Sequence, residues 1–209
     1  MPKDGTATRE RILQSAERLM IEHGYNATSL DQVIAESSSS KGAFFHHFSS
    51  KSDLRLQLVE RYVAKDLAHL DAGLAAVADI DDPAARLVDF VRFYEDSADD
   101  LLSEQSGCLY ATVLAEREIT GRDIADLVAR AALTWRQAIA TLLGTALNER
   151  RPDLGNDIDV DALADHLYAT FEGGFILCRT LNDASAMRSQ LRVFRQLLEA
   201  LLRVDRVTP

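Results

Sequence analysis

The stretch TSLDQVIAESSSSKGAFFHHF, residues 28–48, carries the strongest structural signal in the chain. Its first part predicts a short helix over residues 30–36, in which Leu30, Val33 and Ile34 are apolar at helical spacing. Four serines then interrupt the pattern, and Ser40 is a candidate N-cap for a second short helix, KGAFFHHF. Four residues is the length of a turn rather than of a linker. Two short helices joined by a tight polar turn predict a helix-turn-helix.

The second of these helices has the composition of a recognition helix. Lys41, Gly42 and Ala43 keep its N-terminal end small, where a helix would approach base edges. Phe44 and Phe48 lie four residues apart and are expected to face the core. The side chains expected to point outward are Phe45, His46 and His47, with Lys51 at the start of the following helix. Adjacent histidines diverge by about 100° on a helix, and no carboxylate lies three or four residues away, so we expect no metal site here.

The remaining sequence also predicts helices, and the fold class is all-α. Ile12, Ala16, Leu19 and Met20 share a face that ends at His23-Gly24, a helix follows from about Lys51 to Leu74, and Asp82-Pro83 marks another start. We predict about nine helices and no strand. The expected domains are a helix-turn-helix domain at residues 1–52 and a helical body at residues 53–209.

Charge is distributed unevenly along the 209 residues, whose net charge is −10. Residues 1–52 carry six basic and six acidic side chains, whereas residues 53–209 carry 17 and 27. A neutral N-terminal domain on an acidic body is compatible with DNA binding by that domain. No apolar run or signal core suggests a membrane or secretory segment, so we expect a cytoplasmic protein with no membrane partner. No nucleophile–base pair, HExxH motif or phosphate-binding glycine loop is present, so neither an enzyme nor a cofactor is expected.

The segment TATRERILQSAERLMIEHGYNATSLDQVIAESSSSKGAFFHHFSSKSDL, residues 6–54, resembles the N-terminal domain of the TetR (tetracycline repressor) family. The most specific pieces are GYNATSLDQV and SKGAFFHHFSSKSDL. The resemblance implies a homodimeric transcriptional regulator, usually a repressor, with a double-stranded DNA operator and a small-molecule effector. It also implies release from the operator when the effector enters the helical body.

By position, the resemblance implies a set of DNA contacts. Ser29 and Lys51 would meet phosphates, and His46 and His47 would approach base edges or phosphates. The residues that would open the recognition helix in the major groove are Ser40, Lys41, Gly42 and Ala43.

Three positions depart from the family pattern. Ser38 replaces the usual turn glycine, so a turn that needs φ > 0 would be strained there. Ser39 replaces a small apolar residue. Phe45 replaces the usual tyrosine and would touch a thymine methyl group or a sugar instead of a phosphate. These departures leave open an alternative function, a protein-binding helical adaptor that has lost its affinity for DNA.

The body is expected to bind a planar or largely apolar effector, because aromatic walls with a few polar groups are typical of small-molecule sites. The residues chosen as wall members are Phe93, Tyr110, Trp135 and Tyr168. Cys108 follows Ser106-Gly107 at a predicted helix N-terminus, where the helix dipole favours the thiolate. It is therefore a candidate redox or electrophile sensor, although a buried structural cysteine is the commoner case.

The last two helices are expected to form the dimer interface. They carry more apolar stripe than a monomer of nine helices easily buries, and two such hairpins would pack as a four-helix bundle across a twofold axis. That symmetry predicts a pseudo-palindromic operator. The residues on which this expectation rests are Leu163, Leu167, Phe171, Gly174, Phe175, Leu191, Phe194, Leu198 and Leu201.

Overall fold

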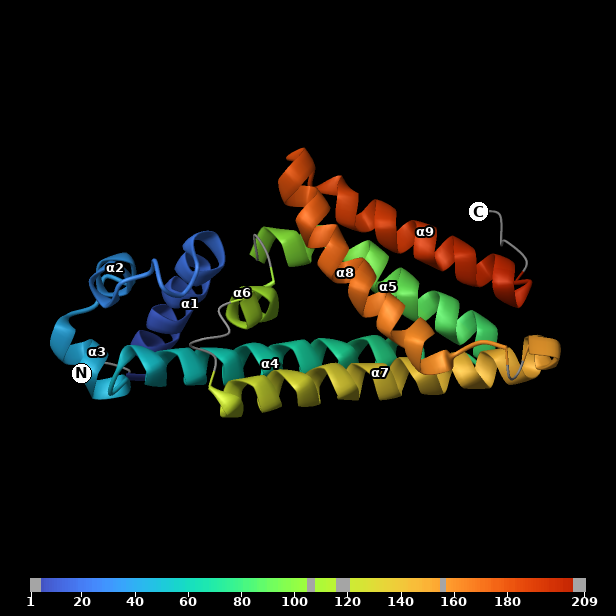
Figure 1. Cartoon of the computed structure of the whole chain (residues 1–209), viewed down its shortest axis with the longest axis horizontal. Helices are drawn as coiled ribbons and strands as arrows, with labels where there is room; N and C mark the ends of the chain where they lie inside the picture. Colours follow the sequence, from blue (N-terminus) through green and yellow to red (C-terminus); the bar gives the residue numbers. More distant parts are fainter. Residues whose placement is uncertain (1–4, 105–107, 116–120, 155–156, 205–209) are drawn as a thin grey trace. The chain divides into compact units, whose positions relative to one another are not determined.

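The computed structural model describes residues 5–104, 108–115, 121–154 and 157–204, with only the backbone described for residues 100–104. This part of the chain contains nine α-helices, one 3-10 turn and no strand, which confirms the all-α prediction (Figure 1). None of the described helices combines the length and apolarity needed to cross a bilayer. The elements are α1 (Gly5–His23), α2 (Leu30–Glu36), α3 (Lys41–His47), α4 (Lys51–Ala76), α5 (Pro83–Glu104), α6 (Leu109–Ala115), α7 (Arg122–Arg150), η1 (Pro152–Leu154), α8 (Val160–Leu181) and α9 (Ser185–Leu202).

Local signals set the ends of the helices. Gly24, in the left-handed region at φ 87°, ends α1 as predicted. Pro83 is the first residue of α5, and the carboxylate of Asp82 accepts a hydrogen bond from the Ala84 N–H at 2.9 Å. Proline is favoured at the first position of a helix because a backbone N–H there would have no acceptor within the helix.

The turn between α2 and α3 takes the strained conformation foreseen for Ser38, whose φ is 50°. The Ser38 N–H donates to the Ala35 carbonyl and the Ser39 N–H to the Ile34 carbonyl, both at 3.1 Å. This pair of bonds is the Schellman motif, in which glycine is usual at the left-handed position. The hydroxyls of Ser37 and Ser39 lie 2.9 Å apart, so the turn is closed by a polar pair.

The contacts divide the chain into two compact units, Met1–Lys65 with Gln105–Ala129, and Asp66–Glu104 with Arg130–Pro209. The boundaries fall inside α4 and α7, so each of these helices contributes to both units. The predicted domain boundary after residue 52 stays a prediction, since the unit that holds the helix-turn-helix also includes the start of α4 and α6. In this first unit, α1 contacts α2, α3 and α6.

In the second unit, α9 lies along α5 and α8 (Figure 1). Glu95 of α5 is buried and accepts hydrogen bonds from Arg192 at 2.8 Å and Arg195 at 2.7 Å. Burial opposes ionisation of Glu95, but the hydrogen bonds from Arg195 and Arg192 outweigh it and lower its pKa. The two arginines therefore hold α9 against α5.

Two glycines permit close packing in this unit. A Cβ on Gly73 would lie 2.6 Å from the Tyr94 hydroxyl oxygen, and a Cβ on Gly174 would lie 2.4 Å from the Met187 sulfur. Gly144, in the second half of α7, has no atom within 4 Å of such a Cβ.

We predict that Ser38→Gly raises the free energy of unfolding by about 0.5–1 kcal/mol, because glycine adopts the left-handed conformation without a Cβ penalty. Urea unfolding followed by circular dichroism measures this change. Ser39→Gly is the matched control, with a negative φ and a hydroxyl pair to lose; it should lower stability. Equal effects of the two substitutions would contradict the assignment of strain to Ser38.

Gly73→Ala is expected to lower the free energy of unfolding by about 1–3 kcal/mol, because the new methyl group clashes with a rigid, buried ring. Gly144→Ala should instead raise it by about 0.5–1 kcal/mol, since alanine is the better helix former and space is open. Thermal unfolding of both variants tests the pair. A gain in stability for Gly73→Ala would show that Tyr94 is loosely held.

Candidate nucleic-acid interface and effector site

Ser29 and Ser40, both predicted at the DNA, cap the two short helices. The Ser29 hydroxyl accepts from the Gln32 N–H at 3.2 Å, and the Ser29 N–H donates to the Gln32 side chain at 2.7 Å, which completes a capping box. The Ser40 hydroxyl accepts from the Ala43 N–H at 3.1 Å. Each cap uses the hydroxyl oxygen as an acceptor, and a serine hydroxyl can also donate its proton.

The two faces of α3 separate core from surface as predicted, except that His47, expected to point outward, is half-buried. Phe44 and Phe48 are fully buried, with ring centroids 5.4 Å apart. The side chain of Phe45 is 54% exposed, and its ring meets Phe44 edge-on at 5.3 Å. His46 is exposed beside it. An apolar ring and an imidazole therefore face outward from one short helix.

Lys41 and Gly42 are exposed at the start of α3, and Ala43 is half-buried. The Lys41 ammonium forms an ion pair with Asp31 of α2 at 3.0 Å, and both side chains are largely exposed. An exposed pair of this kind contributes little free energy. Lys41 can thus exchange the carboxylate for a phosphate at low cost.

His47 lies half-buried against His46, with ring centroids 4.9 Å apart. Burial lowers the pKa of His47, and the nearby His46 and Arg9 lower it further. The imidazole is therefore biased toward its neutral form in the free protein.

Lys51 is held by a residue that the sequence analysis did not name, Tyr25. The Lys51 ammonium donates to the Tyr25 carbonyl at 2.6 Å and lies 4.2 Å from the centre of its ring. The guanidinium of Arg55, one turn along α4, lies 4.6 Å from the same ring. These contacts position the Lys51 ammonium beside Tyr25. The spacing of Lys51 and Arg55 was the available signal, but their shared partner was not visible in the sequence.

An ion-pair network joins the start of α4 to α1. Arg61 donates to the Glu10 carboxylate at 3.0 Å and also pairs with Glu17. The hydrogen bond from Arg61 lowers the pKa of Glu10. This network fixes α4, which begins with Lys51, to the helix that supports α3.

In the second unit, aromatic rings gather around Tyr94. Its own ring is buried, and its hydroxyl donates to the His69 carbonyl at 3.1 Å. Burial, followed by the negative charges of Asp66 and Asp71, raises the pKa of Tyr94. The rings whose centroids lie 5.0–5.5 Å from that of Tyr94 belong to His69, Phe90, Phe93, Trp135 and Phe171, and we call this group the Tyr94 cluster.

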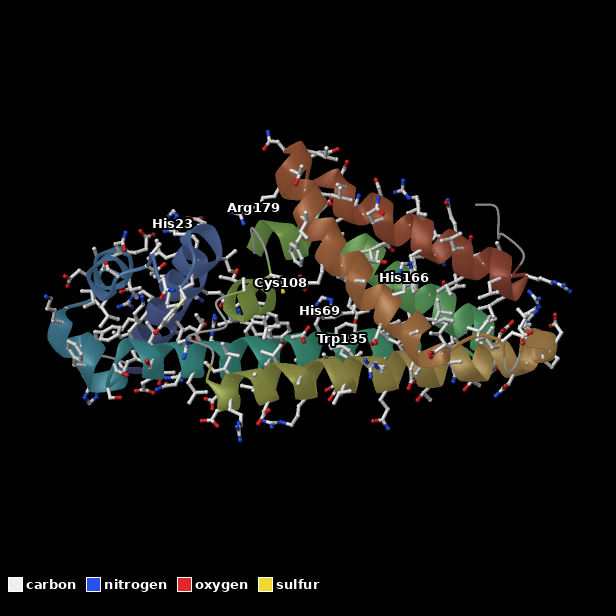
Figure 2. All side chains as sticks on the ribbon, viewed as in Figure 1. His23, His69, Cys108, Trp135, His166 and Arg179 are labelled. Atoms are coloured by element: carbon white, nitrogen blue, oxygen red, sulfur yellow. The ribbon has the colours of Figure 1, made fainter. Side chains whose placement is uncertain are left out.

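Asp66 adds a carboxylate to the Tyr94 cluster. Its Oδ2 accepts a hydrogen bond from the Trp135 indole N–H at 3.1 Å. The labelled His69 and Trp135 side chains in Figure 2 extend from α4 and α7 into the same region. Of the predicted wall residues, the cluster contains Phe93 and Trp135. Asp66, His69 and Phe171 were not chosen, because periodicity alone does not show which helices meet.

Tyr110 and Tyr168 are placed differently. Tyr110 is buried in the first unit, with its ring centroid 4.8 Å from that of Tyr62, and so is not a member of the Tyr94 cluster. Tyr168 is half-buried on α8. Their roles in effector binding stay predictions.

Cys108 is a buried cysteine just before α6. Its carbonyl accepts hydrogen bonds from the N–H of Thr112 at 3.3 Å and from its hydroxyl at 3.1 Å. Reactive cysteines are typically accessible, so this burial does not favour the sensor hypothesis, which stays a prediction. Cys178 on α8 is half-buried.

The apolar stripes of α8 and α9 are largely buried within the chain itself. Leu167, Leu191 and Leu198 are buried in the core of the second unit, and Gly174 packs against Met187 of α9. These residues are therefore not available to a partner, because α5 covers part of the stripe. Other residues of the predicted interface are only half-buried, so the interface itself stays a prediction: Leu163, Phe171, Phe175 and Leu201. The large apolar side chains of α8 and α9 that are exposed are Ile176, Leu181, Val193 and Leu197.

Two family models match the chain. The model described as "Bacterial regulatory proteins, tetR family" matches residues 12–58, and "Tetracyclin repressor-like, C-terminal domain" matches residues 83–194. The transcriptional regulator AcuR of Cereibacter sphaeroides is 26% identical over 196 residues, which cover 91% of this chain and 85% of AcuR.

Solved structures of similar proteins agree with this match. A TetR transcriptional regulator from Chloroflexus aurantiacus superposes with a TM-score of 0.73 at 25% identity, covering 93% of this chain and 95% of its own. A putative transcriptional regulator from Saccharomonospora viridis, solved in complex with choline, gives 0.67 at 27% identity, covering 91% and 96%. The C-terminal model alone spans more than half of the 209 residues, and the N-terminal model spans the helix-turn-helix. The chain belongs to the TetR family of bacterial transcriptional regulators.

Proposed function

We propose that this regulator is a homodimeric repressor that leaves a pseudo-palindromic operator when a small, largely apolar molecule binds its helical body. The observation that carries the proposal is the outward face of α3. A seven-residue helix is anchored by two buried phenylalanines, while Phe45 and His46 on its other face are exposed. Together with the family, this geometry supports insertion of α3 into the major groove.

The proposed contacts fall into two groups. Residues of α3 would read bases, with the Phe45 ring against a thymine methyl group and the two histidines at base edges or phosphates. Ser29 and Lys51 would bind phosphates and set the register. Ser40, Lys41, Gly42 and Ala43 would form the end of α3 that enters the groove.

The proposed dimer interface is the outer surface of α8 and α9. Ile176 is 65% exposed and Leu197 is 60% exposed, with Val193 one turn before Leu197 on α9. Exposed apolar side chains that gather on neighbouring helices mark interaction surfaces. A twofold axis there would present two α3 helices to successive major grooves, about 34–36 Å apart.

The proposed effector site is the Tyr94 cluster. The rings of Phe93, Trp135 and Phe171 are only half-buried, and aromatic walls with a few polar groups suit a small ligand. Asp66, at this cluster, is the first residue of the second unit on α4, the helix that begins with Lys51. A ligand that binds better when the two DNA-binding units of the dimer are farther apart would lower the population competent for the operator.

Selection of random-sequence DNA by the purified protein tests this function directly. We expect enrichment of an inverted repeat, bound by a dimer in a mobility-shift assay, with an affinity that falls steeply as salt rises. A protein that is folded and dimeric but enriches no sequence at any salt concentration would favour the adaptor alternative.

The histidines of α3 predict a pH dependence of operator binding. In the free protein the pKa of His47 is lowered. In the complex, a phosphate or an acceptor on a base edge would raise that pKa. The complex then takes up protons, so the added affinity is present at low pH and is lost as pH rises through the pKa of the complex. We expect about a tenfold gain in affinity between about pH 8 and pH 6 at constant ionic strength.

Fluorescence anisotropy with labelled operator measures this gain. The variant His46→Gln/His47→Gln should flatten the profile, whereas His23→Gln, an exposed histidine at the end of α1, should leave it unchanged. A double variant with the wild-type pH profile would remove both histidines from the DNA contacts.

A further inference from the structure

The carboxylate of Asp66 lies where an aromatic cluster meets the surface of the second unit. It is half-buried and accepts the indole N–H of Trp135 at 3.1 Å. An indole N–H is a neutral donor, so this hydrogen bond orients the carboxylate without cancelling its charge. The negative charge acts on the cluster itself, since Asp66 contributes to the raised pKa of Tyr94 after burial.

Four helices supply rings to the aromatic cluster around Tyr94, to which Trp135, the hydrogen-bond donor to this carboxylate, also belongs. His69 comes from α4, Phe93 from α5, Trp135 from α7 and Phe171 from α8, all half-buried around Tyr94. The centroids of Trp135 and Phe171 lie 6.4 Å apart. Aromatic faces carry negative electrostatic potential and attract cations, most strongly when the cation is shielded from water.

The free energy of binding at this site would differ between a neutral ligand and a cation. A neutral apolar molecule over Trp135 would strip water from the Asp66 carboxylate and return no compensating charge, which costs free energy. A cation would offset that loss and would also gain from the ring faces. The net charge of −10 carried by residues 53–209 attracts cations and repels anions over longer distances.

We infer that the effector is an organic cation, with a quaternary or protonated ammonium group on an apolar body. The ammonium group binds at Asp66, and the apolar body lies against Trp135 and Phe171. This inference rests on the proposed role of the body as the effector-binding part and specifies the chemical class of its ligand.

Two probes of one shape separate charge from apolarity. Phenyltrimethylammonium and tert-butylbenzene differ only by a positively charged nitrogen in place of a carbon. Trp135 is the only tryptophan of the chain, so its fluorescence reports binding at the proposed site. We expect the full-length protein to bind the cation about tenfold more tightly than the neutral probe.

Asp66→Asn keeps the acceptor for the indole N–H and removes the charge. It should weaken binding of phenyltrimethylammonium about tenfold and change binding of tert-butylbenzene by less than about twofold. Asp71→Asn removes the same charge from an exposed position on the same helix and should leave both affinities nearly unchanged. Circular dichroism and thermal unfolding confirm that each variant is folded.

Three results would overturn the inference: equal affinity for both probes, an equal loss of both in Asp66→Asn, or no binding of the cation in the millimolar range. Calorimetry with Trp135→Phe gives an independent check, since loss of the indole should weaken cation binding while the fold persists. Release of operator DNA by neutral apolar compounds alone would overturn the cation site and leave the proposed repressor intact. Charge-dependent binding of the probes without any release of operator DNA would support the cation site and contradict the proposed effector-controlled repressor.

Discussion

The recognition surface depends on the anchoring of one short helix. Seven residues cannot maintain a helix in water by backbone hydrogen bonds alone. Phe44 and Phe48 supply the missing stability by complete burial, and the Ser40 cap satisfies an N–H that the first turn leaves free. These contacts therefore also fix the positions of Phe45 and His46 on the opposite face of α3. The same logic extends to α4, where Tyr25 and Arg61 fix the helix to its surroundings before it reaches the second unit.

Features set by local interactions could be predicted from the sequence. The caps at Ser29 and Ser40 follow from hydroxyl groups placed just before apolar, helical spacing. The start of α5 at Pro83 follows from a ring that fixes φ and lacks an N–H. At Ser38 the resemblance to the family, which usually has glycine there, indicated either strain or a reshaped turn, and the structure has a φ of 50°. Each of these depends on residues within one turn of helix.

Features that depend on contacts between helices far apart in the sequence could not be predicted from the sequence. Periodicity shows which face of a helix is buried but not what covers it. Tyr110 and Trp135 are both aromatic residues in predicted helices, yet the rings that they contact belong to different units. Leu191 and Leu198 were expected at a subunit interface and instead complete the core of their own chain. The carboxylate of Asp66 gave no local signal, since its importance comes from an indole 69 residues away.

The uninterrupted backbone of α4 has a mechanical consequence. Between Lys51 and Asp66 the helix contains neither glycine nor proline, the usual sites of bending. This segment behaves as a stiff lever arm of roughly 22 Å, given a rise of about 1.5 Å per residue. A tilt of about 10° applied at Asp66 would swing Lys51 by roughly 4 Å, comparable with the rise of one base pair along DNA. If a ligand at the proposed effector site tilts α4 by this amount, the displacement is large enough to break the proposed phosphate contact of Lys51.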